Sequence, residues 1–310
     1  MKWIVKAGIM ATSAAMPEGE RFYQWGQRRF GRLTPDPSSR LASAVRLSEW
    51  IASSDGPPLT ECTLMEVGTG HVPLVPTYLW LLGAHSVWTL DLHHRLNEEA
   101  TRATLQGIVS GWNSGLGAAL ERASHDQHLE RRFAVLRELA DSPSDFMDAA
   151  KIRYRAPADA ARTTFPDGSV DVAFSVSVLE HIPSDAILAI LAEERRILGK
   201  TGRSIHFVDM TDHFQHQDPN ITTINFLRFR PWQWRLIGGN EYAYCNRLRA
   251  SELRQLFARA GFEEERVEID VNVVARAAME LGRLRVAPEF ANFSLDDLAA
   301  GSLGLLVRPT

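Results

Sequence analysis

The chain has 310 residues, with 34 Lys and Arg against 38 Asp and Glu, so its formal net charge is −4. Its 45% hydrophobic and 23% charged content is typical of a globular protein and excludes fibrous and disordered classes. This weak negative charge also disfavours nucleic acids and anionic membranes as partners.

The first 60 residues are predicted to be mostly helical. Between Arg40 and Ser53, apolar side chains recur at close to helical spacing. The cluster Asp55-Gly56-Pro57-Pro58 then ends this segment, because Gly and Pro interrupt regular structure. We therefore place a domain boundary near residue 60 and expect residues 1–60 to form an N-terminal helical cover.

From residue 61 onward, short apolar runs alternate with helical patterns. The runs predicted as strands cover residues 63–67, 86–92, 151–154, 170–175, 203–209, 266–273 and 303–308. Predicted helices cover residues 74–82 and 184–198, and a third begins with Ser251 as its cap and stops at Gly261. Such alternation is typical of βαβ units and a parallel sheet, so residues 61–310 are expected to form one α/β domain.

Two long segments interrupt this alternation. Residues 96–149 are largely helical and poor in strand formers, which predicts a helical insertion. Residues 210–249 are rich in aromatic and polar side chains. Because such long irregular segments in compact domains usually serve function, we expect the second insertion to be a substrate-binding segment or lid.

A glycine-rich turn follows the first predicted strand. In Met65-Glu66-Val67-Gly68-Thr69-Gly70-His71 the two glycines allow a sharp turn and a close approach to a ligand. A tight strand-to-helix turn explains this pattern equally well, and Pro73 occupies the place of a dinucleotide loop's third glycine. Asp91 ends the next strand, where a carboxylate can accept both ribose hydroxyls of NAD or of S-adenosylmethionine.

A third element distinguishes these two ligands. Asp159 is followed by Phe165-Pro166-Asp167, then by the strand ending at Ser175 and by Leu179-Glu180-His181. With the glycine turn and Asp91, these motifs make residues 62–272 resemble the class I S-adenosylmethionine-dependent methyltransferases, in particular the small-molecule group that includes ubiquinone-biosynthesis enzymes. The resemblance implies a doubly wound, Rossmann-like, seven-stranded sheet with its last strand antiparallel.

The resemblance also implies a role for individual residues. Glu66, Gly68 and Gly70 would surround the methionine part of the donor, Asp91 the ribose, and Asp159 the adenine amino group, while Ser175 would lie beneath the donor. The full set of cofactor-binding residues expected in this way is Glu66, Gly68, Thr69, Gly70, His71, Asp91, Leu92, Asp159, Ala160 and Ser175. His71 departs from the family pattern, which commonly has a small residue there.

Two histidines are the candidate catalytic residues. His181 follows the fourth strand beside the expected donor, and the ordinary pKa of imidazole, about 6.5, suits proton transfer near neutrality. His181 fits a helix-capping or packing role equally well. His213 is the second candidate base, because the carboxyl ends of parallel strands face the ligand crevice.

The same segment raises the question of a metal site. Residues 209–218 hold two imidazoles and three carboxylates, yet a short His-x-x-His spacing outside a defined helix predicts ligands poorly. Ser177 also stands where some ubiquinone-type relatives have a glutamate that helps to bind a metal. We therefore expect a polar loop and no metal.

The acceptor is expected to bind in the aromatic segment. Phe226, Trp232, Trp234 and Tyr242, with arginines between them, suit a planar acceptor through stacking and cation–π contacts. A hydrophobic lid or a homodimer surface would use the same residue types. The N-terminal aromatics Phe22, Tyr23, Trp25 and Phe30 are expected to fold over the same pocket.

The predicted function is methyl transfer from S-adenosylmethionine, with S-adenosylhomocysteine as product, to an O, N or C atom of a small molecule in specialised-metabolite or glycan biosynthesis. The alternatives are a noncatalytic binding protein on this fold and an NAD-type oxidoreductase, which Pro73 disfavours. Cys62 and Cys245 are too few for a disulfide framework. We expect a cytoplasmic protein with a small-molecule substrate, no nucleic-acid partner and no membrane span.

Overall fold

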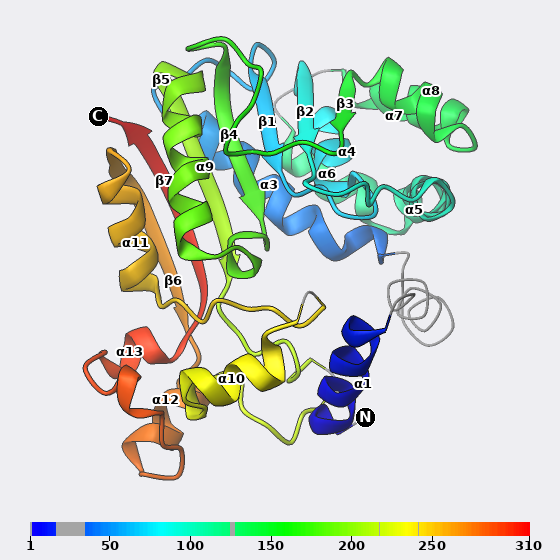
Figure 1. Cartoon of the computed structure of the whole chain (residues 1–310). Helices are drawn as coiled ribbons and strands as arrows, with labels where there is room; N and C mark the ends of the chain where they lie inside the picture. The colour runs from blue at the N-terminus through cyan, green and yellow to red at the C-terminus, as the bar shows by residue number, and fades with distance from the viewer. Residues whose placement is uncertain (1, 17–34, 125–127, 217, 241) are drawn as a thin grey trace.

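The structure is a computed structural model that describes residues 2–16, 35–124, 128–216, 218–240 and 242–310. Within these residues one sheet of seven strands has the order β3-β2-β1-β4-β5-β7-β6 (Figure 1). The strands are β1 (Thr63–Val67), β2 (Ser86–Leu90), β3 (Ile152–Arg155), β4 (Val170–Val176), β5 (Leu198–Asp209), β6 (Phe262–Val271) and β7 (Ala300–Pro309).

The strand directions confirm the predicted topology. β1 pairs in parallel with β2 and β4, and β4 pairs in parallel with β5. β7 lies between β5 and β6 and is antiparallel to both. The sheet is therefore the doubly wound, Rossmann-like arrangement with an antiparallel last strand, and the carboxyl ends of its parallel strands meet at one edge.

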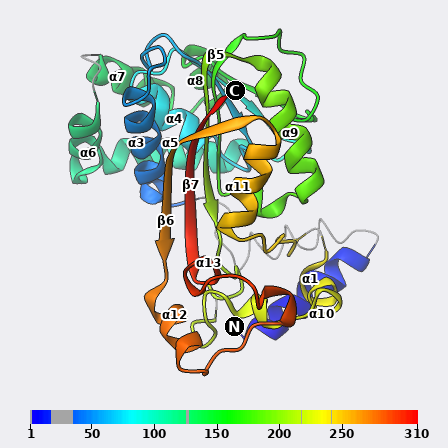
Figure 2. The same ribbon diagram turned by 90° about the vertical axis from the view of Figure 1, so that its left-hand side faces the viewer.

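Helices cover both faces of the sheet (Figure 2). One face carries α3 (Leu41–Ala52) and α4 (Leu74–Leu81), together with the helices between β2 and β3, and the other face carries α9 (Ser184–Ile197) and α11 (Ala250–Arg259). Each layer buries its own apolar core against the sheet. On the α3 side, the ring of Trp50 meets Phe207 of β5 edge to face at 5.0 Å.

The helical segment between β2 and β3 consists of α5 (Glu98–Gly111), α6 (Leu116–Ala123), α7 (Leu129–Leu139) and α8 (Pro143–Ala149). Two short 3-10 turns, η1 (Pro37–Arg40) and η2 (Trp112–Ser114), also pack against α5. Gly115 joins η2 to α6 with a φ of +110°, a conformation that favours glycine. Within the described residues, no helix is long and apolar enough to cross a membrane.

A third layer lies at the carboxyl edge of the sheet (Figures 1 and 2). It contains α1 (Trp3–Ala15), η4 (Asn225–Arg228), α10 (Pro231–Gly238), α12 (Val273–Glu280), η5 (Pro288–Phe290) and α13 (Leu295–Leu298). These elements share an apolar core of their own, which includes Met10, Phe226, Trp234 and Phe290. We refer to this layer as the cap.

Several local expectations need correction. The segment 1–60 divides between two layers, because α1 belongs to the cap whereas α3 packs on the sheet. Ser251 does not cap α11: the helix starts after Arg249, and Ser251 donates its hydroxyl hydrogen to Asp297. The aromatics Phe22, Tyr23, Trp25 and Phe30 lie outside the described residues.

Candidate active site

The turn after β1 has the backbone that its glycines predict. Gly68 and Gly70 have φ values of +83° and +73°, in the left-handed region that favours glycine. A Cβ on Gly68 would lie 2.6 Å from the Val178 side chain, whereas one on Gly70 would enter open space. The turn therefore packs against the segment after β4 on one side and leaves room beside Gly70 on the other.

Asp91 ties this turn to the next two strands. Its side chain is largely buried and accepts hydrogen bonds from the Gly70 amide at 3.2 Å and the Tyr154 hydroxyl at 3.1 Å. Burial, outweighing these hydrogen bonds, raises the pKa of Asp91. The Asp91 carbonyl accepts from the Ala158 amide at 2.8 Å, so the loop that carries Asp159 is held beside it.

Glu66 lies inside the sheet rather than at its surface. The Thr89 hydroxyl donates to its carboxylate at 2.5 Å, and Thr69 contacts Thr89 in turn. Burial raises the pKa of Glu66 to about 8. Glu66 therefore supports the turn from below, in a form that is largely protonated at neutral pH.

The loop after β3 forms the far end of the candidate donor site. Asp159 lines a cavity of about 480 Å³ with Leu90 and Phe165. One Asp159 carboxylate oxygen accepts from the Ala161 amide at 2.9 Å, which fixes the loop as an Asx turn. Leu92 follows Asp91 directly and is 61% exposed, but it does not line this cavity.

Two residues that were expected to bind the methyl donor have side chains that contact other protein groups. Ser175 is fully buried, and its hydroxyl lies 2.7 Å from His206 Nδ1 in a network with Ser204 and Glu194. The His71 ring lies 3.0 Å from the Arg95 carbonyl through Nδ1. The Ser175 hydroxyl therefore lies inside the sheet. If Ser175 contacts the methyl donor as predicted, it must do so through its backbone.

Arg40 is a residue at this edge that the sequence motifs did not identify. It ends η1, and its guanidinium donates to the Ser177 hydroxyl at 3.0 Å. It is close enough to Glu66 that its charge opposes the rise in the pKa of that carboxyl. No motif marks an arginine that reaches the sheet from a separate 3-10 turn.

His181 lies in η3 (Leu179–His181), directly after β4. Its Nδ1 lies 2.8 Å from the Tyr244 carbonyl and donates to it, which leaves Nε2 with the lone pair. The Asn246 side-chain amide donates to the Leu179 and Ile182 carbonyls at 2.7 and 2.8 Å, which holds the turn. Burial lowers the pKa of His181.

His213 reaches the same place from the loop after β5. Its ring centroid lies 4.9 Å from that of His181. His213 Nε2 lies 3.5 Å from a carboxylate oxygen of Asp209. Burial opposes protonation, but the hydrogen bonding and charge of Asp209 outweigh it and raise the pKa of His213. The two candidate catalytic histidines are therefore neighbours, although 31 residues separate them in the chain.

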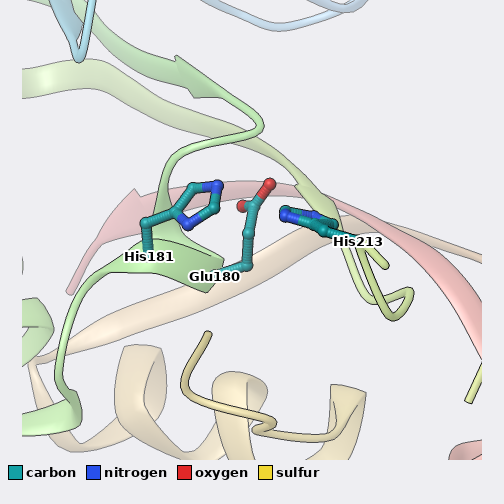
Figure 3. A group of neighbouring side chains, drawn as sticks. All are labelled: Glu180, His181 and His213. Atoms are coloured by element: carbon teal, nitrogen blue, oxygen red, sulfur yellow. The ribbon is translucent and has the colours of Figure 1, made fainter. Parts of the chain in front are cut away.

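Glu180 lies between these two rings (Figure 3). Its side chain is 2% exposed, and burial raises its pKa to about 8. In the sequence, Glu180 is recognisable only as part of the family motif Leu179-Glu180-His181. Its place between two imidazoles depends on the loop after β5, which local pattern alone does not position.

A narrow pocket adjoins the two histidines. Phe226, Trp234 and Tyr242 line it together with His181 and His213, so three of the four expected acceptor residues meet the candidate bases. Lys6 and Met10 of α1 also line the pocket. Trp232 is 57% exposed and lies outside this lining.

A comparison with known families bears on the class of protein. Residues 127–206 match the family model described as a methyltransferase domain. This stretch includes β3, Asp159, β4 and η3. The matched domain covers only part of the chain; together with the strand order, it supports a class I S-adenosylmethionine-dependent methyltransferase. The chain carries its glycine turn and Asp91 before the matched stretch, on the adjoining strands.

The solved structures that this chain resembles have low sequence identity to it. A protein from Pyrococcus horikoshii OT3 is 13% identical, with a TM-score of 0.47, over 92% of this chain and 98% of the other. A geranyl diphosphate methyltransferase in complex with S-adenosylmethionine is 13% identical, with a TM-score of 0.46, over 88% and 90%. Geranyl diphosphate C-methyltransferase from Streptomyces coelicolor A3(2) is 12% identical, with a TM-score of 0.47, over 87% and 79%. No curated protein matches the sequence.

The residues at the carboxyl edge fit S-adenosylmethionine, the cofactor of this class. Asp91 presents a carboxylate at the end of β2, and a Cβ on Gly70 would enter open space beside it. The Asp159 cavity can take an adenine beside Leu90. The Arg40 guanidinium offers a cation for the donor's carboxylate.

Proposed function

We propose that the protein transfers the methyl group of S-adenosylmethionine to a hydroxyl or amino group of a small planar molecule. The acceptor atom forms a bond to the methyl carbon while the bond from that carbon to the sulfonium sulfur breaks. The electron pair of the broken bond stays on sulfur, which gives S-adenosylhomocysteine, and the acceptor loses its proton. Because this reaction is an in-line displacement, alignment of donor and acceptor supplies much of the catalysis.

One observation carries the proposal. The glycine turn, which is expected to hold the methyl donor, packs directly against the segment after β4 that leads to His181. Gly68 is held so close to Val178 that a Cβ there would lie 2.6 Å from its side chain. Val178 is three residues before His181 in the chain. A donor seated on the glycine turn would therefore present its methyl group toward the His181 side of the edge.

The pocket's cavity of about 30 Å³ would have to widen to admit an aromatic acceptor, but its lining favours a planar molecule that must lose a proton. Phe226, Trp234 and Tyr242 supply aromatic walls, which favour planar ligands. His181 and His213 are imidazoles in this lining that could accept the acceptor's proton. A simple aliphatic acceptor would make no use of the aromatic lining.

A product assay tests this proposal. The full-length protein is incubated with S-adenosylmethionine and a panel of phenols, aromatic amines and matched aliphatic alcohols and amines, and S-adenosylhomocysteine is quantified. We expect turnover with an aromatic member, and we expect His181→Ala to reduce it about 100-fold while donor affinity is retained. Turnover with aliphatic members alone, or donor binding without any turnover across the panel, would contradict the proposal.

A further inference from the structure

Glu180 has a chemical environment that methyl transfer alone does not explain. Both of its carboxylate oxygens are buried, and neither has a hydrogen-bond partner among the described residues. Buried carboxylates in folded proteins are normally paired with donors, cations or metal ions. This one is directed into the space between two imidazoles (Figure 3).

The geometry of the three side chains is that of a ligand cluster. One ligand atom from each of Glu180, His181 and His213 can be chosen so that all three lie within 4.8 Å of one another. His181 donates through Nδ1 to the Tyr244 carbonyl, so its Nε2 lone pair is available to a ligand. The cluster opens toward the pocket that His181 and His213 line with aromatic side chains.

We infer that Glu180, His181 and His213 bind a divalent transition-metal ion such as Zn²⁺. Two imidazoles and one carboxylate are ligands that Zn²⁺ and its neighbours in the first transition row prefer, whereas Mg²⁺ and Ca²⁺ favour oxygen ligands. Three protein ligands also leave a fourth position of a tetrahedral Zn²⁺ ion open toward the pocket. The expectation of no metal rested on residues 209–218 and on Ser177, whereas two of these three ligands come from η3.

Small side-chain movements would complete the site. A Zn²⁺ ion lies about 2.0–2.2 Å from nitrogen and oxygen ligands, which places tetrahedral ligand atoms about 3.4 Å apart. Both segments that carry the ligands are fixed: the Asn246 amide at 2.9 Å from the Glu180 carbonyl holds η3, and Asp212 accepts from the Phe214 amide at 2.9 Å beside His213. Rotation of side chains on this fixed backbone can bring the three groups together.

Asp209 supplies the outer support that such sites use. Its carboxylate lies 3.5 Å from His213 Nε2, and carboxylates that contact metal-bound imidazoles fix the orientation of the ring. Asp209 is itself held by the Thr211 amide and hydroxyl at 2.9 and 2.6 Å. The ion would lie beside the candidate acceptor. Because both histidines would be its ligands, the ion, and not a free imidazole, would lower the pKa of an acceptor hydroxyl held at its open position. That consequence rests on the proposed function, whereas the binding itself does not.

Metal titration of the full-length protein tests the inference. After treatment with a chelator and its removal, Zn²⁺ binding is measured by calorimetry and Co²⁺ binding by visible absorption. We expect one site with a Kd of about 1 µM or tighter. Glu180→Gln and His213→Ala should each weaken this site by about tenfold or more. His216→Ala is the matched control, because its ring lies 5.4 Å from that of His213 but outside the cluster, and it should bind within about twofold of the native protein.

The outcomes separate this inference from the proposed function. Absence of Zn²⁺ and Co²⁺ binding by the native protein at about 100 µM metal would overturn it. Equal loss in His216→Ala and His213→Ala, or native affinity in Glu180→Gln, would overturn it as well. Affinity for S-adenosylhomocysteine, measured on the same samples, reports on the fold and on the donor site, so a methyltransferase without a metal site would be recognised as such.

Discussion

The proposed donor end and the proposed acceptor end of this protein are built in different ways. At the donor end, neighbouring strands of one sheet bring the residues together, and short contacts join them: the Gly70 amide to Asp91, and the Ala158 amide to the Asp91 carbonyl. At the acceptor end, residues from α1, the loop after β5, η4 and α10 meet around a separate apolar core. The sheet therefore fixes the donor site, whereas packing of the cap fixes the acceptor site.

This difference implies that a mutation can destabilise one end without affecting the other. Two apolar cores hold the sheet between its helix layers, and the cap has a third. Trp234 is the centre of aromatic contacts in the cap: its ring meets Phe214, Phe226 and Phe229, and its Nε1 donates to the Cys245 carbonyl at 3.0 Å. Loss of this side chain should therefore damage the acceptor pocket and spare the donor site.

The largest effect is expected from Trp234→Ala. Removal of a buried tryptophan costs about 3–5 kcal/mol of unfolding free energy, here expected to fall on the cap. Hydrogen exchange should show faster opening of α10 and α1, while affinity for S-adenosylhomocysteine stays within about threefold of native. Trp232→Ala on the same helix is the control, because its 57% exposed side chain should cost no more than about 0.5 kcal/mol. A large loss of affinity for S-adenosylhomocysteine in Trp234→Ala would show that the cap and the donor end do not fold independently.

Asp91→Ala is expected to have the reverse effect. It removes the carboxylate for the ribose together with the contacts to Gly70 and Tyr154, so affinity for S-adenosylhomocysteine should fall about 100-fold in calorimetry. The cap should exchange hydrogen at its native rate. Asp171→Ala is the matched control, because that carboxylate accepts from the Thr63 amide at the start of β1, at the opposite edge of the sheet. Unchanged affinity in Asp91→Ala would remove Asp91 from the donor site.

A smaller effect is expected from the titration of Glu66. Its pKa of about 8 in the folded protein exceeds that of an unfolded glutamate, so its contribution to stability is fully present below about pH 4.5 and is lost as pH rises through 8. Glu66→Gln should remove roughly 3 kcal/mol of the decrease in unfolding free energy between pH 6 and 9. Denaturant titrations at both pH values measure this, and identical pH dependence in the variant would contradict the assigned environment.

Local pattern predicted the parts of the molecule that local forces determine. The approximate places of the seven strands, the tight turn at Gly68 and Gly70 and the left-handed stop at Gly261 follow from short sequence patterns and were predicted correctly. The antiparallel last strand was predicted from the family resemblance instead. The proximity of Asp91 to the glycine turn follows from the parallel pairing of β1 with β2. For the same reason, His181 and His213 were both expected at the carboxyl edge.

What the sequence could not predict depends on contacts between distant segments. Arg40 reaches Ser177 across 137 positions, and the loop after β5 brings His213 to Glu180. The hydroxyl of Ser175 is directed to His206 because a partner on β5 is available inside the sheet. Periodicity also did not reveal α12 and α13, since both are short and each buries only one apolar residue, Ala275 and Leu298, in the cap core.

Calorimetric titration with S-adenosylmethionine, S-adenosylhomocysteine and NAD tests the central claim most directly, because it needs no knowledge of the acceptor. The donor site described above predicts that both adenosyl ligands bind with a Kd of about 1 µM and that NAD does not bind at about 1 mM. Tighter binding of NAD than of S-adenosylhomocysteine, or failure of both adenosyl ligands to bind, would contradict it.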